Sequence, residues 1–302
     1  MKLGLVFPTC DIGSDPVAIR DYAQGAEALG FDSLLTFDHV LGAEHAGRVP
    51  PLAGPYDESF PFHEPFVLLA FLAAATQRIE LATGVLVLPQ RATALVAKQA
   101  SELQNLSRGR LRLGVGTGWN RIEAEALGSR WAGRGRRFDE QIALLRELWS
   151  ASAIDFAGEF HRIDRAGILP LPERRIPLWF GGASARAYER AARAGDGFVF
   201  RPDDREYGAE LARIRDRMRK LGRDPGGFGA ECTVSYARGP EHWLARLAHW
   251  RAAGGTHFSV QAHDFGAEKL GAPAAGLAGV GDHLRALERF AGAVRGALRQ
   301  PG

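Results

Sequence analysis

The feature that most constrains the fold is a regular alternation of strand-like and helix-like segments along the 302 residues. This alternation favours βα units and a parallel sheet. A count of eight strands in strict alternation with helices favours a closed barrel over an open sheet. We therefore predict a (β/α)8 TIM barrel. Its strands are expected at residues 3–7, 31–37, 79–88, 110–115, 177–180, 196–200, 229–236 and 256–261.

The predicted helices carry their own boundary signals. Asp15 followed by Pro16 is typical of a helix start, and Ser184 is placed to cap a helix that runs to residue 194. Other helices are expected near Pro65, at 92–106, 136–149, 207–221 and 241–253, and at the end of the chain. Residues 151–175 alternate only weakly, so we expect a small insertion there rather than a core element.

Length and composition fit one soluble domain over residues 1–302, because α/β barrels commonly reach this size. The two cysteines, Cys10 and Cys232, form no disulfide framework and suit a reducing cytoplasm. No apolar run approaches the ~18 residues that a membrane span requires. The net charge of +3 is too small to indicate nucleic acid as a partner.

In such a barrel the active site lies at the carboxyl ends of the strands. Asp38-His39 is the only Asp-His pair at such an end, and a histidine there can donate a hydrogen bond to a cofactor or exchange a proton with a substrate. The alternative is a buried histidine that a backbone carbonyl satisfies. Position alone does not separate these two interpretations.

Glycine-rich turns follow three further strands. Gly181-Gly182-Ala183-Ser184 opens a helix, so its amides could bind an anion, although a plain turn with a serine cap is the alternative. Thr83-Gly84 could be a bulge where the backbone meets a ligand. Residues 114–118 lack the G-x-G-x-x-G spacing, so a flat ring lying against glycine explains them better than a dinucleotide fold. No metal-ligand spacing and no G-x-S-x-G elbow is evident.

Five strings in order resemble the luciferase-like monooxygenase superfamily, most closely its F420-dependent oxidoreductase branch. They are GFDSLLTFDHV (30–40), RIELATGVLVLPQR (78–91), LSRGRLRLGVGTGWNRIEAEALG (106–128), RGRRFDEQIALLRELW (134–149) and PLWFGGASARAYERAARAGDGF (177–198). The resemblance implies a barrel that holds F420, or alternatively FMN, at the strand ends. It also implies a homodimer and a separate reductase that regenerates the reduced cofactor.

The resemblance carries roles onto particular residues. His39 is expected at the reactive face of the ring as the catalytic residue, with Asp38 helping to hold the cofactor. A non-proline cis peptide is expected at Gly84-Val85, behind the ring. The cofactor-binding residues are then expected to be Asp38, Thr83, Gly84, Val85, Thr117, Gly118, Gly181, Gly182 and Ser184, the last three as a phosphate clamp.

Two positions depart from the family pattern. Trp119 stands where the sugar-phosphate dehydrogenases of the family carry a glutamate acid, which argues against that substrate and for an apolar or aromatic pocket. Gln104 replaces a usual aspartate. The implied function is hydride transfer between F420 and a small organic substrate. The alternatives are an FMN-dependent monooxygenase that uses oxygen, and a flavin- or F420-binding protein without turnover.

Overall fold

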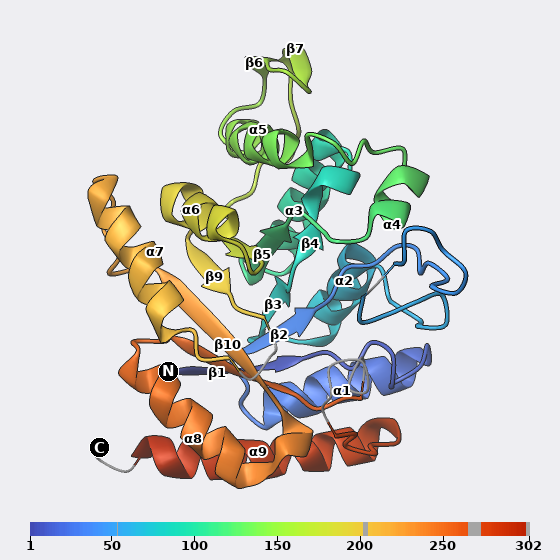
Figure 1. Ribbon diagram of the computed structural model, residues 1–302, viewed down its shortest axis with the longest axis vertical. Helices are drawn as coiled ribbons and strands as arrows, with labels where there is room; N and C mark the ends of the chain where they lie inside the picture. The colour runs from blue at the N-terminus through green and yellow to red at the C-terminus, as the bar shows by residue number, and fades with distance from the viewer. Residues whose placement is uncertain (53, 202–204, 265–272, 300–302) are drawn as a thin grey trace.

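Eight parallel strands close into a barrel in the computed structural model, which describes residues 1–52, 54–201, 205–264 and 273–299 (Figure 1). Each strand pairs with the next around the ring, and a β3–β5 pairing closes it. The fold predicted from the alternation is confirmed. The strands in ring order are β1 (Lys2–Val6), β2 (Ser33–Thr36), β3 (Glu80–Thr83), β5 (Leu111–Gly116), β8 (Leu178–Gly181), β9 (Gly197–Val199), β10 (Gly229–Ser235) and β11 (His257–Gln261).

Helices surround this ring and cover its outer face (Figure 1). Asp15 caps the first of them by accepting a hydrogen bond from the Val17 amide, as the Asp15-Pro16 signal predicts. The longer helices are α1 (Pro16–Ala28), α2 (Pro65–Ala75), α3 (Thr93–Leu106), α5 (Arg134–Leu148), α6 (Ala185–Ala194), α7 (Gly208–Lys220), α8 (Gly239–Ala252) and α9 (Gly279–Arg299). Among the described residues, no helix combines the length and apolar character that crossing a membrane would need.

The stretch predicted as one strand interrupted at Thr83-Gly84 is divided in two one residue later, at Gly84-Val85. β3 ends at Thr83, and β4 (Leu86–Val87) resumes the pairing with β5 after the Gly84-Val85 peptide, which is cis as expected. A short 3₁₀ turn, η1 (Leu88–Gln90), then leads into α3. The chain therefore changes direction at the mouth of the barrel.

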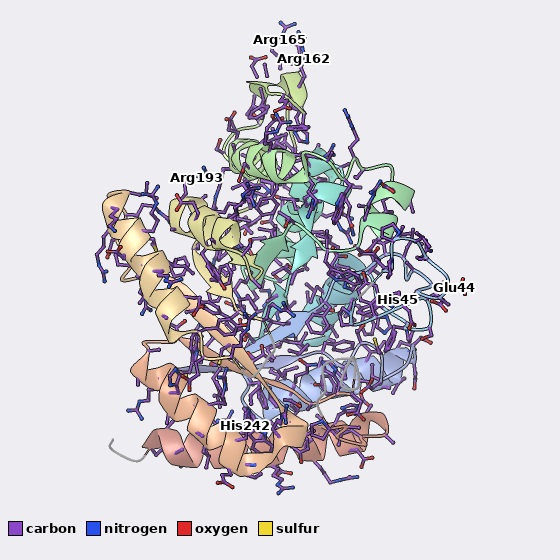
Figure 2. All side chains as sticks on the ribbon, in the orientation of Figure 1. Glu44, His45, Arg162, Arg165, Arg193 and His242 are labelled. Atoms are coloured by element: carbon purple, nitrogen blue, oxygen red, sulfur yellow. The ribbon has the colours of Figure 1, made fainter. Side chains whose placement is uncertain are left out.

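The insertion expected at 151–175 is an antiparallel hairpin of β6 (Ile154–Ala157) and β7 (Arg162–Ala166). Figure 2 shows Arg162 and Arg165 at its outer end, far from the ring. The short helix α4 (Arg121–Ala126) was not predicted, because six residues are too few to display an apolar period.

The interior of the barrel is partly ionic. Arg112 is 2% exposed and forms ion pairs with Glu231 and with Glu80 at 2.7 Å. Its guanidinium lies over the Trp179 ring, 4.1 Å from the centroid. A buried cation requires such pairing, and the two carboxylates provide it.

Candidate functional site

The carboxyl ends of the strands surround a cavity of about 540 Å³. This volume lies in the range of small-molecule and cofactor sites. The structure brings nine of the ten predicted site residues to its wall. They are Asp38, His39, Gly84, Val85, Thr117, Gly118, Gly181, Gly182 and Ser184.

Thr83 is the exception, because it does not line the cavity. Its side chain is 1% exposed, and its hydroxyl donates a hydrogen bond to the Gly114 carbonyl at 2.6 Å. Since β3 ends there, the side chain faces the neighbouring strand β5 instead of the mouth. This hydrogen bond therefore holds the end of β3, which Gly84 and Val85 follow directly.

Val85 forms the floor of the cavity together with two glycines. A Cβ added to Gly116 would lie 2.6 Å from Val85 Cγ2, and one added to Gly181 would lie 2.7 Å from Val85 Cγ1. Only glycine at these two positions therefore leaves room for the Val85 side chain between β5 and β8. The result is a flat, apolar floor that suits the face of a planar ring.

Asp38 is held by an ionic network at the wall of the cavity. Its side chain is fully buried, and its oxygens accept hydrogen bonds from Arg91 Nη2 at 2.6 Å and from the Val87 amide at 2.7 Å. Arg91 also contacts Glu64 at 2.8 Å. The carboxylate thereby ties the end of β2 to β4.

His39 follows Asp38, and its ring is 13% exposed. Its Nδ1 lies 3.2 Å from Glu123 Oε2, and the ring packs against Tyr56 with the centroids 3.6 Å apart. The interpretation of His39 as a histidine satisfied by a backbone carbonyl does not describe this geometry, because Nδ1 faces a carboxylate. His39 also lines the cavity.

The sequence analysis did not find Glu123, which is 1% exposed at the first turn of α4. Burial by itself raises the pKa of this carboxyl, but hydrogen bonds and charge from His39, with the Val40 amide and the Tyr56 hydroxyl, hold it below its ordinary value. The carboxylate is therefore ionised at neutral pH. The one available signal was Asn120 three residues earlier, because Asn-x-x-Glu is typical of a helix start.

Aromatic side chains cover the outer side of His39. Phe62 lies 4.8 Å and Trp119 6.3 Å from its ring, centroid to centroid. Trp119 rests on the backbone of Gly54, where an added Cβ would lie 1.9 Å from the indole. Trp119 also lines the cavity, and Gly54 and Pro55 of the segment 40–63 line it beside Trp119. Figure 2 shows the outer edge of this segment at Glu44 and His45.

The opposite end of the cavity is the start of α6. Gly182 has φ 138°, a conformation that disfavours other residues, and Ser184 caps the helix by accepting a hydrogen bond from the Ala187 amide. The first amides of a helix have no intrahelical partner, and the helix dipole favours an anion there. A flat ring against Val85 and a phosphate near Ser184 both fit the residues present.

Among the described residues, no group of three or more histidine, cysteine or acidic side chains is arranged to hold a metal ion. Gln104, the second departure from the family pattern, is a structural residue. Its amide donates to the Arg174 and Arg175 carbonyls at 3.3 and 3.2 Å and accepts from the Leu111 amide at 2.9 Å. It therefore joins α3 to β5 and to the segment before β8.

A family model of luciferase-like monooxygenases matches residues 1–295. A closed parallel barrel whose strand ends surround one cavity agrees with that match, and the chain belongs to this family. The resemblance predicted from the five sequence strings is confirmed.

Several relatives are similar in sequence. An uncharacterised protein of Mycobacterium tuberculosis is 37% identical over 208 residues, 68% of this chain and 71% of that protein. The F420-dependent glucose-6-phosphate dehydrogenase of Nakamurella multipartita is 32% identical, over 78% of this chain and 69% of its own length. The FMNH(2)-dependent dimethylsulfone monooxygenase of Pseudomonas fluorescens is 34% identical, but over only 61% of this chain and 46% of its own length.

Solved structures share the fold. A monooxygenase from Streptomyces bottropensis superposes with a TM-score of 0.78 at 22% identity, covering 98% of this chain and 99% of that one. An F420-dependent secondary alcohol dehydrogenase superposes with a TM-score of 0.75 at 17% identity, covering 97% and 99%.

Proposed function

We propose that this chain is an oxidoreductase that transfers a hydride between coenzyme F420 and a small organic substrate. The observation that carries the proposal is the convergence of His39, the Val85 floor and the start of α6 on one cavity. Relatives named as F420-dependent dehydrogenases support it. When bound, F420 supplies the hydride chemistry.

The residues of the chain have separate tasks in this proposal. Val85, Gly116 and Gly181 support one face of the ring, and Thr117 and Gly118 border it. Gly181, Gly182 and Ser184 hold the phosphate, because a hydroxyl that accepts a hydrogen bond can also donate one. Asp38 does its part indirectly: its carboxylate joins the end of β2 to β4 and so holds the wall of the cavity in place. His39 donates a hydrogen bond or a proton on the reacting side, and the aromatic cover excludes water.

We further propose that the substrate is small, neutral and apolar or aromatic. Trp119 stands where a glutamate acid would support sugar-phosphate chemistry, and with Phe37, Pro55 and Val87 it gives this end of the cavity an apolar wall. Glucose 6-phosphate is therefore not the expected substrate, despite the name of the Nakamurella relative.

FMN is the second candidate cofactor, and the dimethylsulfone monooxygenase relative favours it. The test is titration of the purified protein with F420 and with FMN. We expect F420 to bind and FMN to bind weakly or not at all. Binding of FMN alone would replace the dehydrogenase proposal with an oxygen-using monooxygenase.

A pair of variants completes this test. His39→Ala is expected to lower turnover by about 10²–10⁴-fold with cofactor binding retained, as removal of a general acid does. His249→Ala, at a site 41% exposed on α8, is the control and should leave turnover unchanged. If neither reduced cofactor is oxidised by any compound of a broad substrate panel, the chain is a binding protein without turnover.

We also propose a cytoplasmic homodimer that receives reduced cofactor from a separate reductase. Two free cysteines agree with a reducing compartment. An apolar, solvent-exposed face of α2 and α3 supports the dimer, since Val67, Phe71 and Leu95 are 70%, 41% and 57% exposed.

A further inference from the structure

Glu123 is buried and accepts three hydrogen bonds, and its fourth polar neighbour is the His39 ring. Oε1 accepts from the Val40 amide at 2.6 Å and from the Leu41 amide at 3.4 Å, while Oε2 accepts from the Tyr56 hydroxyl at 2.9 Å and faces His39 Nδ1 at 3.2 Å. Both backbone amides can only donate. An ionised carboxylate accepts hydrogen bonds on both of its oxygens, and the donors around Glu123 require such an acceptor.

The protonation of the His39 ring follows from this arrangement. Because Oε2 is an acceptor, Nδ1 must carry a hydrogen in order to bond with it. The other ring nitrogen, Nε2, then carries no hydrogen in the neutral ring, and His39 lines the cavity. Tyr56 and Phe62 pack against the ring and oppose its rotation.

We propose that Glu123 is the positioning residue of the active site, and that it keeps His39 protonated on Nδ1 so that Nε2 alone exchanges a proton with the ligand. Nε2 accepts a proton from the ligand when the ring is neutral, and it donates that proton back when the ring is an imidazolium. Nδ1 keeps its hydrogen throughout, so one proton moves and the balance is complete. The role of Nε2 rests on the proposed function, whereas the protonation of Nδ1 does not.

The same carboxylate also links His39 to the segment 40–63. Val40 and Leu41 begin that segment, and Tyr56 lies near its far end and is fully buried. The same set of hydrogen bonds therefore holds His39, Val40, Leu41 and Tyr56 in place together. The lowered pKa of Glu123 agrees with an ionised acceptor at the centre of this set.

Glu123→Gln gives a sharp test, because the amide has nearly the same shape and only one acceptor atom. The Val40 and Leu41 amides must take the glutamine oxygen, which turns its NH₂ group toward Nδ1. Nδ1 then becomes an acceptor, and the hydrogen moves to Nε2. We expect the tautomer of His39 to reverse, from Nδ1–H in the wild type to Nε2–H in the variant.

The measurement is ¹⁵N NMR of histidine-labelled full-length protein above the titration range of histidine, with His39→Ala used to assign the signals. Glu125→Gln is the matched control, because Glu125 lies on the same short helix in an exposed pair with Arg121, and it should leave the tautomer unchanged. Tyr56→Phe removes a donor to Oε2 and should also keep Nδ1–H.

Two results would overturn the proposal: an Nε2–H tautomer in the wild type, or an unchanged tautomer in Glu123→Gln. If the glutamine variant does not fold, the tautomers of the wild type and of Tyr56→Phe still decide the question. The readout needs no cofactor, so failure of F420 and FMN to bind would reject the proposed function while leaving this inference to be judged by the tautomer alone.

Discussion

The side chain of Val85 occupies space at the barrel mouth that is free only because Gly116 and Gly181 have no Cβ. A Cβ added to either glycine would lie 2.6 or 2.7 Å from Val85, which is closer than real Cβ atoms approach other atoms. A methyl group on either strand would push the valine up into the cavity. The glycines of β5 and β8 are therefore required by the shape of the floor.

Gly181→Ala should displace Val85 and weaken cofactor binding, with a loss of folding stability of about 1–3 kcal/mol from overpacking. Cofactor titration and chemical denaturation measure the two effects. The double variant Gly181→Ala with Val85→Ala should recover binding. Gly292→Ala is the control, since an added Cβ there meets nothing within 4 Å. Equal affinity in Gly181→Ala and the wild type would show that Val85 is not the floor.

Arg91 neutralises the buried carboxylate of Asp38, and it makes a second ion pair with Glu64. Arg91→Met leaves Asp38 buried without its cation. We expect a loss of about 3–5 kcal/mol in the free energy of unfolding, which is typical of breaking a buried pair. The measurement is urea denaturation followed by circular dichroism.

Arg121→Met is the matched control for Arg91, because Arg121 is 62% exposed and pairs with Glu125 along the surface of α4. Exposed pairs contribute about 1 kcal/mol or less. A similar loss in the two variants would mean that the Asp38–Arg91 pair has no special role in stability.

At the scale of elements, local signals account for several helix starts. Asp15-Pro16, Pro65 and Ser184 place the starts of α1, α2 and α6 close to where they are observed. α4 escaped prediction because a helix of six residues shows too little of the helical period. That omission also hid Glu123, because the position of a side chain on a helix is known only once the helix is.

The face of α2 that points away from the barrel is apolar, which is unusual for a helix in contact with water. Val67 and Phe71 lie on adjacent turns of that face, and Leu95 of the neighbouring helix α3 is also exposed. In a lone barrel these side chains would stay in solvent. A second copy of the chain would remove them from water.

Phe71→Glu should therefore convert a dimer into a monomer, because it places a charge inside the proposed apolar interface. Analytical ultracentrifugation measures the change in mass. Leu221→Glu, at a residue 39% exposed at the end of α7, is the control and should remain dimeric. A wild-type chain that sediments as a monomer would remove the basis for the dimer.

At the scale of the whole molecule, two buried histidines connect stability with pH. Burial, with the charge of Arg112, lowers the pKa of His257 to about 3, and burial, with His283, lowers that of His263 to about 3. In the unfolded chain both titrate near 6.5. The unfolded state therefore takes up protons first as the pH falls.

Stability should be complete above about pH 6.5 and decline as the pH falls toward 3, by about 1.4 kcal/mol per pH unit for each histidine. His257→Gln should make this decline less steep, whereas His249→Gln, at a site 41% exposed, should not. Denaturation across this pH range measures the slopes. Identical slopes in all three proteins would contradict the role of His257.

We propose that residues 1–302 form one domain, because strands from both ends of the chain pair directly and α9 packs against α1. β1 pairs with β11, so the ring cannot close without either end. The same denaturation series should then give one transition by both fluorescence and circular dichroism. Two separate transitions would divide the chain.

The alternation of strands and helices, the glycines of the mouth and the Asp38-His39 position were all determined by the sequence itself. Each depends on local backbone preference or on the rule that parallel strands present their carboxyl ends at one face. Residues that are close along the chain carry these signals. For this reason nine of the ten predicted site residues reach one cavity.

The tertiary structure alone decided which side chains meet. Glu123 reaches His39 across 84 residues, and Arg112 reaches Glu231 across 119. These pairs depend on the closure of the strand ring and on the segment 40–63 near His39. Neither can be predicted from a periodic pattern in the sequence. Thr83 faces Gly114 instead of the cavity for the same reason, since the direction of a side chain at a strand end is set by the neighbouring strand.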